Sequence, residues 1–295
     1  MIGQTIGRHL SKIVLAPSCA AVLLFVYGFI LWTVAISFTK SRLLPTLTLE
    51  GLGAYRTLWA IDRWHVALGN LALFGGLFIA LCLIIGVSLA ILLDQHIRGE
   101  GALRAIYLHP MALSFIVTGT AWKWILNPDI GLQQSLRDLG FAGFTFDWIA
   151  RADTAVYCLV IAAVWQSSGF VMALVLAALR GIDQDLIKAA TIDGASPSRL
   201  YWSIVLPAIR PVFLSATVIL AHIAIKSYDL VVALTGGGPG YASELPATFM
   251  VEMAFRRSRI DVGAASASLM LAAVMAVVVP YLYAELRAGK DGASR

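Results

Sequence analysis

The sequence predicts an all-α integral membrane protein with six transmembrane helices. Of its 295 residues, 59% are hydrophobic and only 13% are charged, whereas a soluble domain carries about 25% charged residues. Six apolar segments reach the roughly 20 residues that a helix needs to cross the bilayer core: 13–38, 66–93, 107–126, 154–179, 212–232 and 263–284. These segments lack polar faces, which excludes a soluble helical bundle.

Charged residues are rare inside the predicted spans. The first, second, fourth and sixth spans contain none, the third contains Lys123, and the fifth contains Lys226 and Asp229. Each such charge costs roughly 2.5–3.5 kcal/mol at a helix centre, so these three residues require an explanation by position or by function. We expect residues 1–12 to form a cytoplasmic N-terminus and residues 13–295 to form one transmembrane domain.

The distribution of Lys and Arg favours a cytoplasmic location for both termini. In that orientation the inner segments hold eleven Lys and Arg, and the longer outer loops, 39–65, 127–153 and 233–262, hold nine. Positive residues concentrate on the cytoplasmic side of membrane proteins, so we expect a multi-pass protein of a bacterial inner membrane. The basic residues form no stripe, and no nucleic-acid partner is predicted.

The loop 180–211, between the fourth and fifth spans, is too polar to cross the bilayer and is expected to form two helices. Asp183 is a suitable N-cap for a first helix over 184–193, and Gly194 can end it in the left-handed conformation. Ser196 and Pro197 are suited to begin a second helix, which we expect to stop before Pro207. Such a hairpin is either a rigid contact for a cytoplasmic partner or an amphipathic interfacial element.

The motif K-A-A-x3-G-x9-I-x-L-P at residues 188–207 resembles the EAA loop of binding-protein-dependent ABC importer permeases, whose pattern begins E-A-A. The resemblance implies the type I ABC importer permease fold and a coupling helix that docks on a separate ATPase subunit. Lys188 reverses the charge of the family's leading Glu, and Asp185, on the same helical face, is a candidate to compensate. The residues that the resemblance assigns to ATPase coupling are Asp185, Lys188, Ala189, Ala190, Asp193 and Gly194.

Two further motifs resemble the carbohydrate-uptake subgroup of these permeases. They are W-x2-N-P-x2-G at 124–131 and L-T-G-G-G-P at 234–239, and they are similar to the first of the two permeases in maltose-type importers. The stretch 229–250 looks most like permeases for glucose, mannose or α-glucosides. The resemblance implies a complex with a second permease, two ATP-binding cassette subunits and a periplasmic or lipid-anchored sugar-binding protein.

A polar run in the fourth span is the first candidate for a sugar site. Gln166 lies about 18 Å below the outer end of this span, and polar groups at such depth are functional hypotheses by default. Helix–helix packing by small residues is the alternative explanation. The resemblance places Gln166, Ser167 and Phe170 at positions that contact sugar in maltose-type relatives.

The fifth span supplies the second candidate group. His222, Lys226 and Asp229 follow a spacing that puts them on one helical face, where Lys226 and Asp229 can pair. Snorkelling to the outer interface would also explain these two charges. The resemblance adds Ser227, and Tyr228 completes the set of candidate substrate-binding residues.

No catalytic site is predicted. The chain lacks a Gly-x4-Gly-Lys-Ser/Thr phosphate loop, so ATP is expected to be used by the partner ATPase, and its five scattered histidines suggest neither a metal site nor a nucleophile–base pair. We therefore expect no cofactor and no enzymatic activity. The alternatives are an ion-coupled secondary transporter, which would predict inverted repeats or paired broken helices, and an ABC permease for a polyol or other non-glucose solute.

Overall fold

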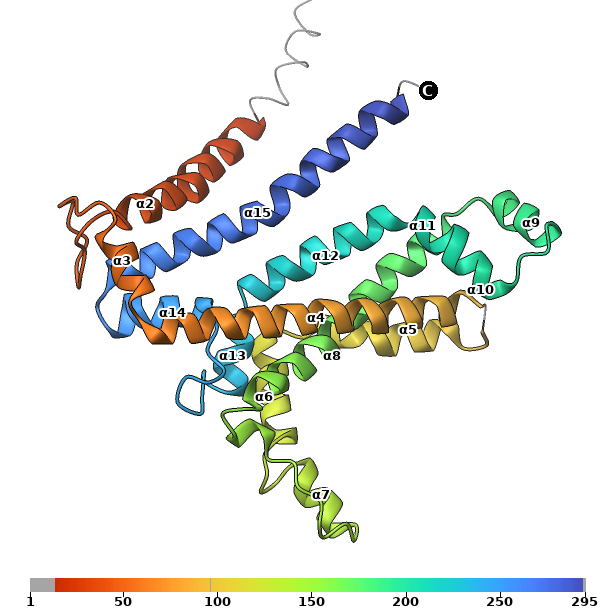
Figure 1. Cartoon of the computed structure of the whole chain (residues 1–295), viewed down its shortest axis with the longest axis horizontal. Coiled ribbons are helices and arrows are strands. Elements are labelled where there is room, and N and C mark those ends of the chain that lie inside the picture. The colour runs from red at the N-terminus through yellow and green to blue at the C-terminus, as the bar shows by residue number, and fades with distance from the viewer. Residues whose placement is uncertain (1–13, 96, 294–295) are drawn as a thin grey trace, which may run out of the picture. The chain divides into compact units, whose positions relative to one another are not determined.

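The structure is a computed structural model that describes residues 14–95 and 97–293, and all regular elements in this part of the chain are helical. The predicted cytoplasmic segment 1–12 lies outside the described residues. The chain divides into two compact units, whose helices are labelled in Figure 1. One comprises Met1–Ile61 and Phe249–Leu271, and the other comprises Asp62–Thr248 and Ala272–Arg295.

The first unit contains the first span and the loop that follows it. The span is one continuous helix, Val14–Ile36, whose later part is the π-helical η1 (Leu23–Tyr27) followed by α2 (Gly28–Ile36). The loop is closed by a bridge between Thr39 and Leu49, and the backbone amide of Asp261 donates to the carbonyl of Ser41 at 2.9 Å. The remaining elements are α3 (Gly53–Trp59), the second half of α14 (Pro246–Val251), η5 (Glu252–Arg256) and the start of α15 (Ile260–Ala293).

The second unit is built around α8 (Ala155–Arg180), which is the most buried of its long helices. The long helix α4 (Asp62–Asp94) packs on α8 so closely that a Cβ on Gly86 would lie 2.6 Å from the Cβ of Val171. The same unit contains α5 (Glu100–Leu108), η2 (His109–Ala112), α6 (Phe115–Ile125), α7 (Leu132–Asp138), η3 (Trp148–Ala150), α9 (Gln184–Ile192), α10 (Pro197–Leu200), η4 (Tyr201–Val205), α11 (Leu206–Ala208), α12 (Arg210–Ile225) and α13 (Asp229–Leu234).

The predicted fold class is confirmed, and two of the predicted spans are broken rather than continuous. Four helices are long and apolar enough to cross a membrane: Val14–Ile36, Asp62–Asp94, Ala155–Arg180 and Ile260–Tyr283. The third span bends by 101° between Glu100–Ala112 and Phe115–Ile125, and a bend of 61° at Ile209 separates Tyr201–Ala208, in the loop 180–211, from Arg210–Ile225, which begins the fifth span. Counting each bent pair as one span gives six.

Local chemistry explains the break in the third span. In the third span, Pro110 lacks a backbone donor, and the Ser114 hydroxyl accepts from the Val117 amide at 3.3 Å, which starts a new helix. The fifth span was expected to run to Val232, but α12 ends at Ile225 and α13 begins at Asp229. The second helix of the loop 180–211 was expected to stop before Pro207, but η4 is followed directly by α11, which runs to Ala208. Pro207 lies in the first turn of α11, where proline is tolerated.

Candidate functional site

Gln166 joins α8 to the break in the third span. Its side chain is only 4% exposed, and its Nε2 donates to the carbonyl oxygen of Leu113 at 2.8 Å. Leu113 lies at the 101° bend, where the helical hydrogen-bond ladder is interrupted. The Oε1 atom of Gln166 is buried and has no hydrogen-bond partner among the described residues, so the side chain has one committed donor and one unpaired acceptor.

Gly169 allows the backbones of α8 and the third span to touch. A Cβ at this position would lie 2.0 Å from the carbonyl oxygen of Tyr107, which no side chain can tolerate. Gly169 follows Gln166 by one helical turn. The close approach and the Gln166 hydrogen bond therefore fix the broken span against α8 at two successive levels.

The other candidates in α8 surround this point. Ser167 and Ser168 are buried, and Phe170 is half-buried and packs against the apolar core. Trp165 meets Trp122 of α6 edge to face, with ring centroids 5.9 Å apart. The predicted polar run is thus an inward-facing cluster at the junction of α8, α5 and α6.

The candidates of the fifth span do not share one helical face, because α12 ends at Ile225, after His222 and before the other candidates. Lys226 caps α12, and the Ser227 hydroxyl donates to the carbonyl of Ile223 at 3.0 Å. Ser227 is buried and Tyr228 half-buried, whereas His222, Lys226 and Asp229 are exposed. Within the described residues no ion pair joins Lys226 to Asp229, although the sequence suggested one.

The first helix of the loop 180–211 is built as the sequence predicts. The Asp183 carboxylate accepts from the Asp185 amide at 2.9 Å, so Asp183 caps α9. Gly194 has a φ of 79°, the Gly194 amide donates to Thr191, and the Ala195 amide donates to Ala190, each at 3.0 Å. These two bonds form a Schellman motif, and they make the turn between α9 and α10 a defined elbow.

The exposed surface of α9 carries both apolar and charged groups. Ile192 is 85% exposed, and Leu186 is exposed on the same short helix. Lys188 forms an ion pair with Asp185 at 3.0 Å, so the carboxylate that was expected to compensate for the reversed charge does lie beside it. Ala189 and Asp193 are exposed and Ala190 is buried.

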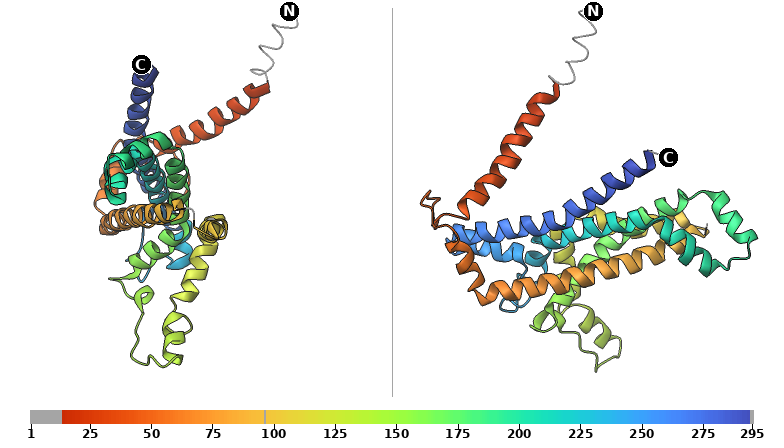
Figure 2. Two further views of the ribbon diagram at one scale, coloured as in Figure 1. Left: turned by 90° about the vertical axis from the view of Figure 1, so that its right-hand side faces the viewer. Right: turned by 45° about the horizontal axis from the view of Figure 1, so that its top comes forward.

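The second helix of this loop is tied to α4. The Tyr201 hydroxyl donates to the Asp94 carboxylate at 3.1 Å and accepts from Gln95 Nε2 at 3.2 Å. Within the second unit, α9 and α10 lie at one end, and the loop that follows α13 lies far from them (Figures 1 and 2). These hydrogen bonds connect the helix that follows the elbow to the end of α4.

The loop after α13 is held by residues that sequence reasoning missed. Arg63 forms a bidentate ion pair with Glu244, with one contact of 2.6 Å between Nη2 and Oε1. Asn70 donates to the carbonyls of Ala242 and Glu244 at 2.8 and 2.9 Å. We call the contacts of Arg63 and Asn70 with this loop the clamp. The sequence signal for it was a lone Asn in an apolar span, whereas no local pattern in the sequence pairs Arg63 with Glu244.

Comparison with known proteins identifies the family. Residues 83–286 match the family described as binding-protein-dependent transport system inner membrane component. The chain is 36% identical to the xylose/arabinose import permease protein XacH of Haloferax volcanii over 90% of this chain and 84% of that protein. It is 32% identical to the trehalose/maltose transport system permease protein MalF of Thermococcus litoralis over 92% of each.

A solved structure has the same fold. It is the crystal structure of a bacterial ABC transporter involved in the import of the acidic polysaccharide alginate. One chain of that structure superimposes on this chain with a TM-score of 0.82 at 18% sequence identity, and the match covers 97% of this chain and 98% of that chain. The motif at 188–207, the capped elbow at Gly194 and the family match agree, and this chain belongs to the inner-membrane permeases of binding-protein-dependent ABC importers.

Proposed function

We propose that this chain translocates a sugar into the cytoplasm by alternating access, driven by ATP hydrolysis in separate ATPase subunits. The observation that carries the proposal is the rigid helical elbow of α9 and α10. Its exposed residues, Leu186 and Ile192 among them, suit a protein partner, since an apolar group this exposed costs free energy unless something covers it. We assign α9 as the helix that docks on the ATPase.

The elbow also supplies a mechanical route to the membrane part. The Schellman motif at Gly194 fixes the angle between α9 and α10, and the Tyr201 hydroxyl attaches the following helix to Asp94 at the end of α4. Closure of an ATPase pair that moves α9 would thus move α4. Such a movement can shift the balance between the inward-facing and outward-facing states only if the ATPase binds α9 more tightly in one state than in the other.

The polar junction on α8 is the proposed sugar contact in this subunit. Gln166 offers an unpartnered acceptor, Oε1, to a sugar hydroxyl, and Phe170 offers an aromatic surface to a ring face. Ser167 and Ser227 are the further candidates, and both are buried. His222, Lys226, Tyr228 and Asp229 remain secondary candidates at the outer end of α12.

The relatives support carbohydrate as the proposed substrate class. Permeases named for xylose and arabinose and for trehalose and maltose are similar to the chain over most of its length. The proposed complex contains a second permease, two ATP-binding cassette subunits and an external sugar-binding protein, with both termini of this chain in the cytoplasm. Glucose, mannose or an α-glucoside is the specific expectation.

The experiment is uptake into proteoliposomes that contain the complex purified with its co-expressed partner subunits. We expect a radiolabelled sugar to accumulate only when the binding protein is outside and ATP is inside. The panel should contain glucose, mannose, maltose, trehalose, xylose, arabinose and a polyol. Uptake that needs no ATP and collapses with an uncoupler would instead identify an ion-coupled transporter, and uptake of the polyol alone would remove sugar from the proposal.

A further inference from the structure

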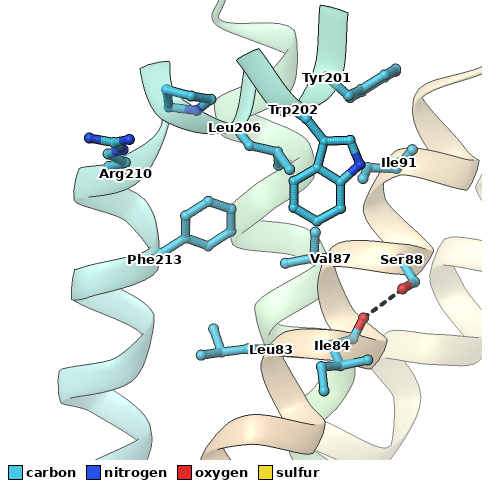
Figure 3. Close-up of a pocket in the computed structure, with 11 residues that line it drawn as sticks. Leu83, Ile84, Val87, Ser88, Ile91, Tyr201, Trp202, Leu206, Arg210 and Phe213 are labelled. Carbon is cyan, nitrogen blue, oxygen red and sulfur yellow. Dashed lines mark hydrogen bonds between the residues drawn. The ribbon is translucent and has the colours of Figure 1, made fainter. Parts of the chain in front are cut away.

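An open groove lies between α4 and the bent segment that runs from η4 to α12 (Figure 3). It holds about 590 Å³. Its wall is almost entirely apolar, with Leu83, Ile84, Val87 and Ile91 from α4 and Leu206 and Phe213 from the opposite side. A groove of this kind accepts a hydrocarbon chain without cost to polar groups.

The two hydroxyl groups along the groove are already hydrogen-bonded, and one lining residue is charged. The Ser88 hydroxyl donates to the carbonyl of Ile84 at 2.7 Å, and the Tyr201 hydroxyl is bound to Asp94. Arg210 lines the groove, is exposed, and forms no ion pair with any described residue. Its guanidinium is therefore the group that the groove offers to an anion.

The position of Arg210 matches the level of lipid headgroups. Arg210 begins the 16-residue helix α12, which rises about 24 Å through a hydrocarbon core about 30 Å thick. Trp202, also a lining residue, is 75% exposed, and indole rings favour the membrane–water boundary. Figure 3 shows Arg210 and Tyr201 toward one end of the groove and Leu83 and Ile84 toward the other, so the groove has a polar end and an apolar end.

We propose that this groove binds an anionic phospholipid, with its phosphate on Arg210 and one acyl chain between α4 and α12. Charge complementarity favours a headgroup of net negative charge, because the ammonium group of a zwitterionic lipid offsets part of the attraction between its phosphate and the guanidinium. The proposal rests on the proposed function in one respect, namely that the loop 180–211 faces the cytoplasm, where anionic lipids attract basic residues. The lipid would contact both sides of the 61° bend at Ile209 and would bias the angle through which the elbow acts on the membrane part.

Lipid titration of the purified full chain, followed by native mass spectrometry, tests the proposal. Phosphatidylglycerol and phosphatidylcholine with identical acyl chains are the two probes. We expect the wild-type chain to bind phosphatidylglycerol about fivefold more tightly, Arg210→Gln to lose this preference, and Arg210→Lys to keep it. Ile84→Trp, which fills the groove, should weaken the binding of both lipids.

Arg199→Ala is the matched control, since Arg199 is an exposed arginine of α10 that does not line the groove. It should bind both lipids as the wild-type chain does. Equal affinities in the wild-type chain, or a preference that survives in Arg210→Gln, would overturn the proposal. If the Ile84→Trp chain binds both lipids as the wild-type chain does but no longer assembles with the second permease, the groove is a protein interface instead. The lipid titration does not measure transport, so a negative result for lipid binding would not contradict the proposed transport function.

Discussion

Replacing Gly169 with Ala should separate the broken third span from α8. The new Cβ would lie 2.0 Å from the Tyr107 carbonyl oxygen and 2.8 Å from its carbon, and neither is the end of a flexible side chain. The backbones would have to part by about 1.5 Å to restore an ordinary contact. Overpacking of this kind typically costs about 1–3 kcal/mol, and we expect the upper part of that range because backbone must move.

The same displacement should reach the proposed sugar site. Gln166 lies one turn away, and a shift of this size would stretch its 2.8 Å bond to Leu113 beyond the hydrogen-bond range. We therefore expect Gly169→Ala to lower both the melting temperature of the purified chain and sugar uptake by the reconstituted complex. Gly76→Ala is the control, because a Cβ there meets no atom within 4 Å. Wild-type melting and uptake in Gly169→Ala would refute the close-contact reasoning.

Three further substitutions test other parts of the account. Gly194→Val should leave ATP hydrolysis active and uncouple it from uptake, because φ is 79° at this position and a left-handed residue other than Gly costs about 1–2 kcal/mol. Gly194→Asn should keep hydrolysis coupled to uptake, and tight coupling in Gly194→Val would contradict the role of the elbow. Arg63→Leu should destabilise the purified chain by about 3–5 kcal/mol in denaturant unfolding, because the Glu244 carboxylate is 2% exposed and would lose its ion pair with Arg63. The double variant with Glu244→Gln should recover part of the lost stability, and wild-type stability of Arg63→Leu would argue against a stabilising role for this ion pair. Tyr201→Phe should cost about 0.5–1.5 kcal/mol in the same assay through the lost bond to Asp94, and an unchanged unfolding curve would exclude this link.

The sequence predicted the spans and the elbow because their signals are local. Apolar length identifies a span without knowledge of its neighbours. Asp183 and Gly194 act on backbone groups within a few residues of themselves, so their roles as N-cap and left-handed residue could be inferred correctly.

The breaks in the spans and the long-range hydrogen bonds and ion pairs could not be predicted in the same way. Hydropathy averages over a window and does not register an interruption of two or three residues, as at 113–114 and 226–228. The partner of Gln166 lies 53 positions away at Leu113, and Glu244 lies 181 positions from Arg63. Pairings at such distances depend on how the helices pack, which a single sequence does not reveal.

The most direct test of the central claim is a photo-crosslinking residue at Ile192, the exposed end of α9, in membranes that contain the co-expressed complex. Leu139, also exposed and located in the outer loop 127–153, is the control position. We predict that Ile192 forms an adduct with the ATPase subunit and that Leu139 does not. An ATPase adduct from Leu139, or none from Ile192 in a complex that transports its sugar, would contradict the assignment of α9 as the coupling helix.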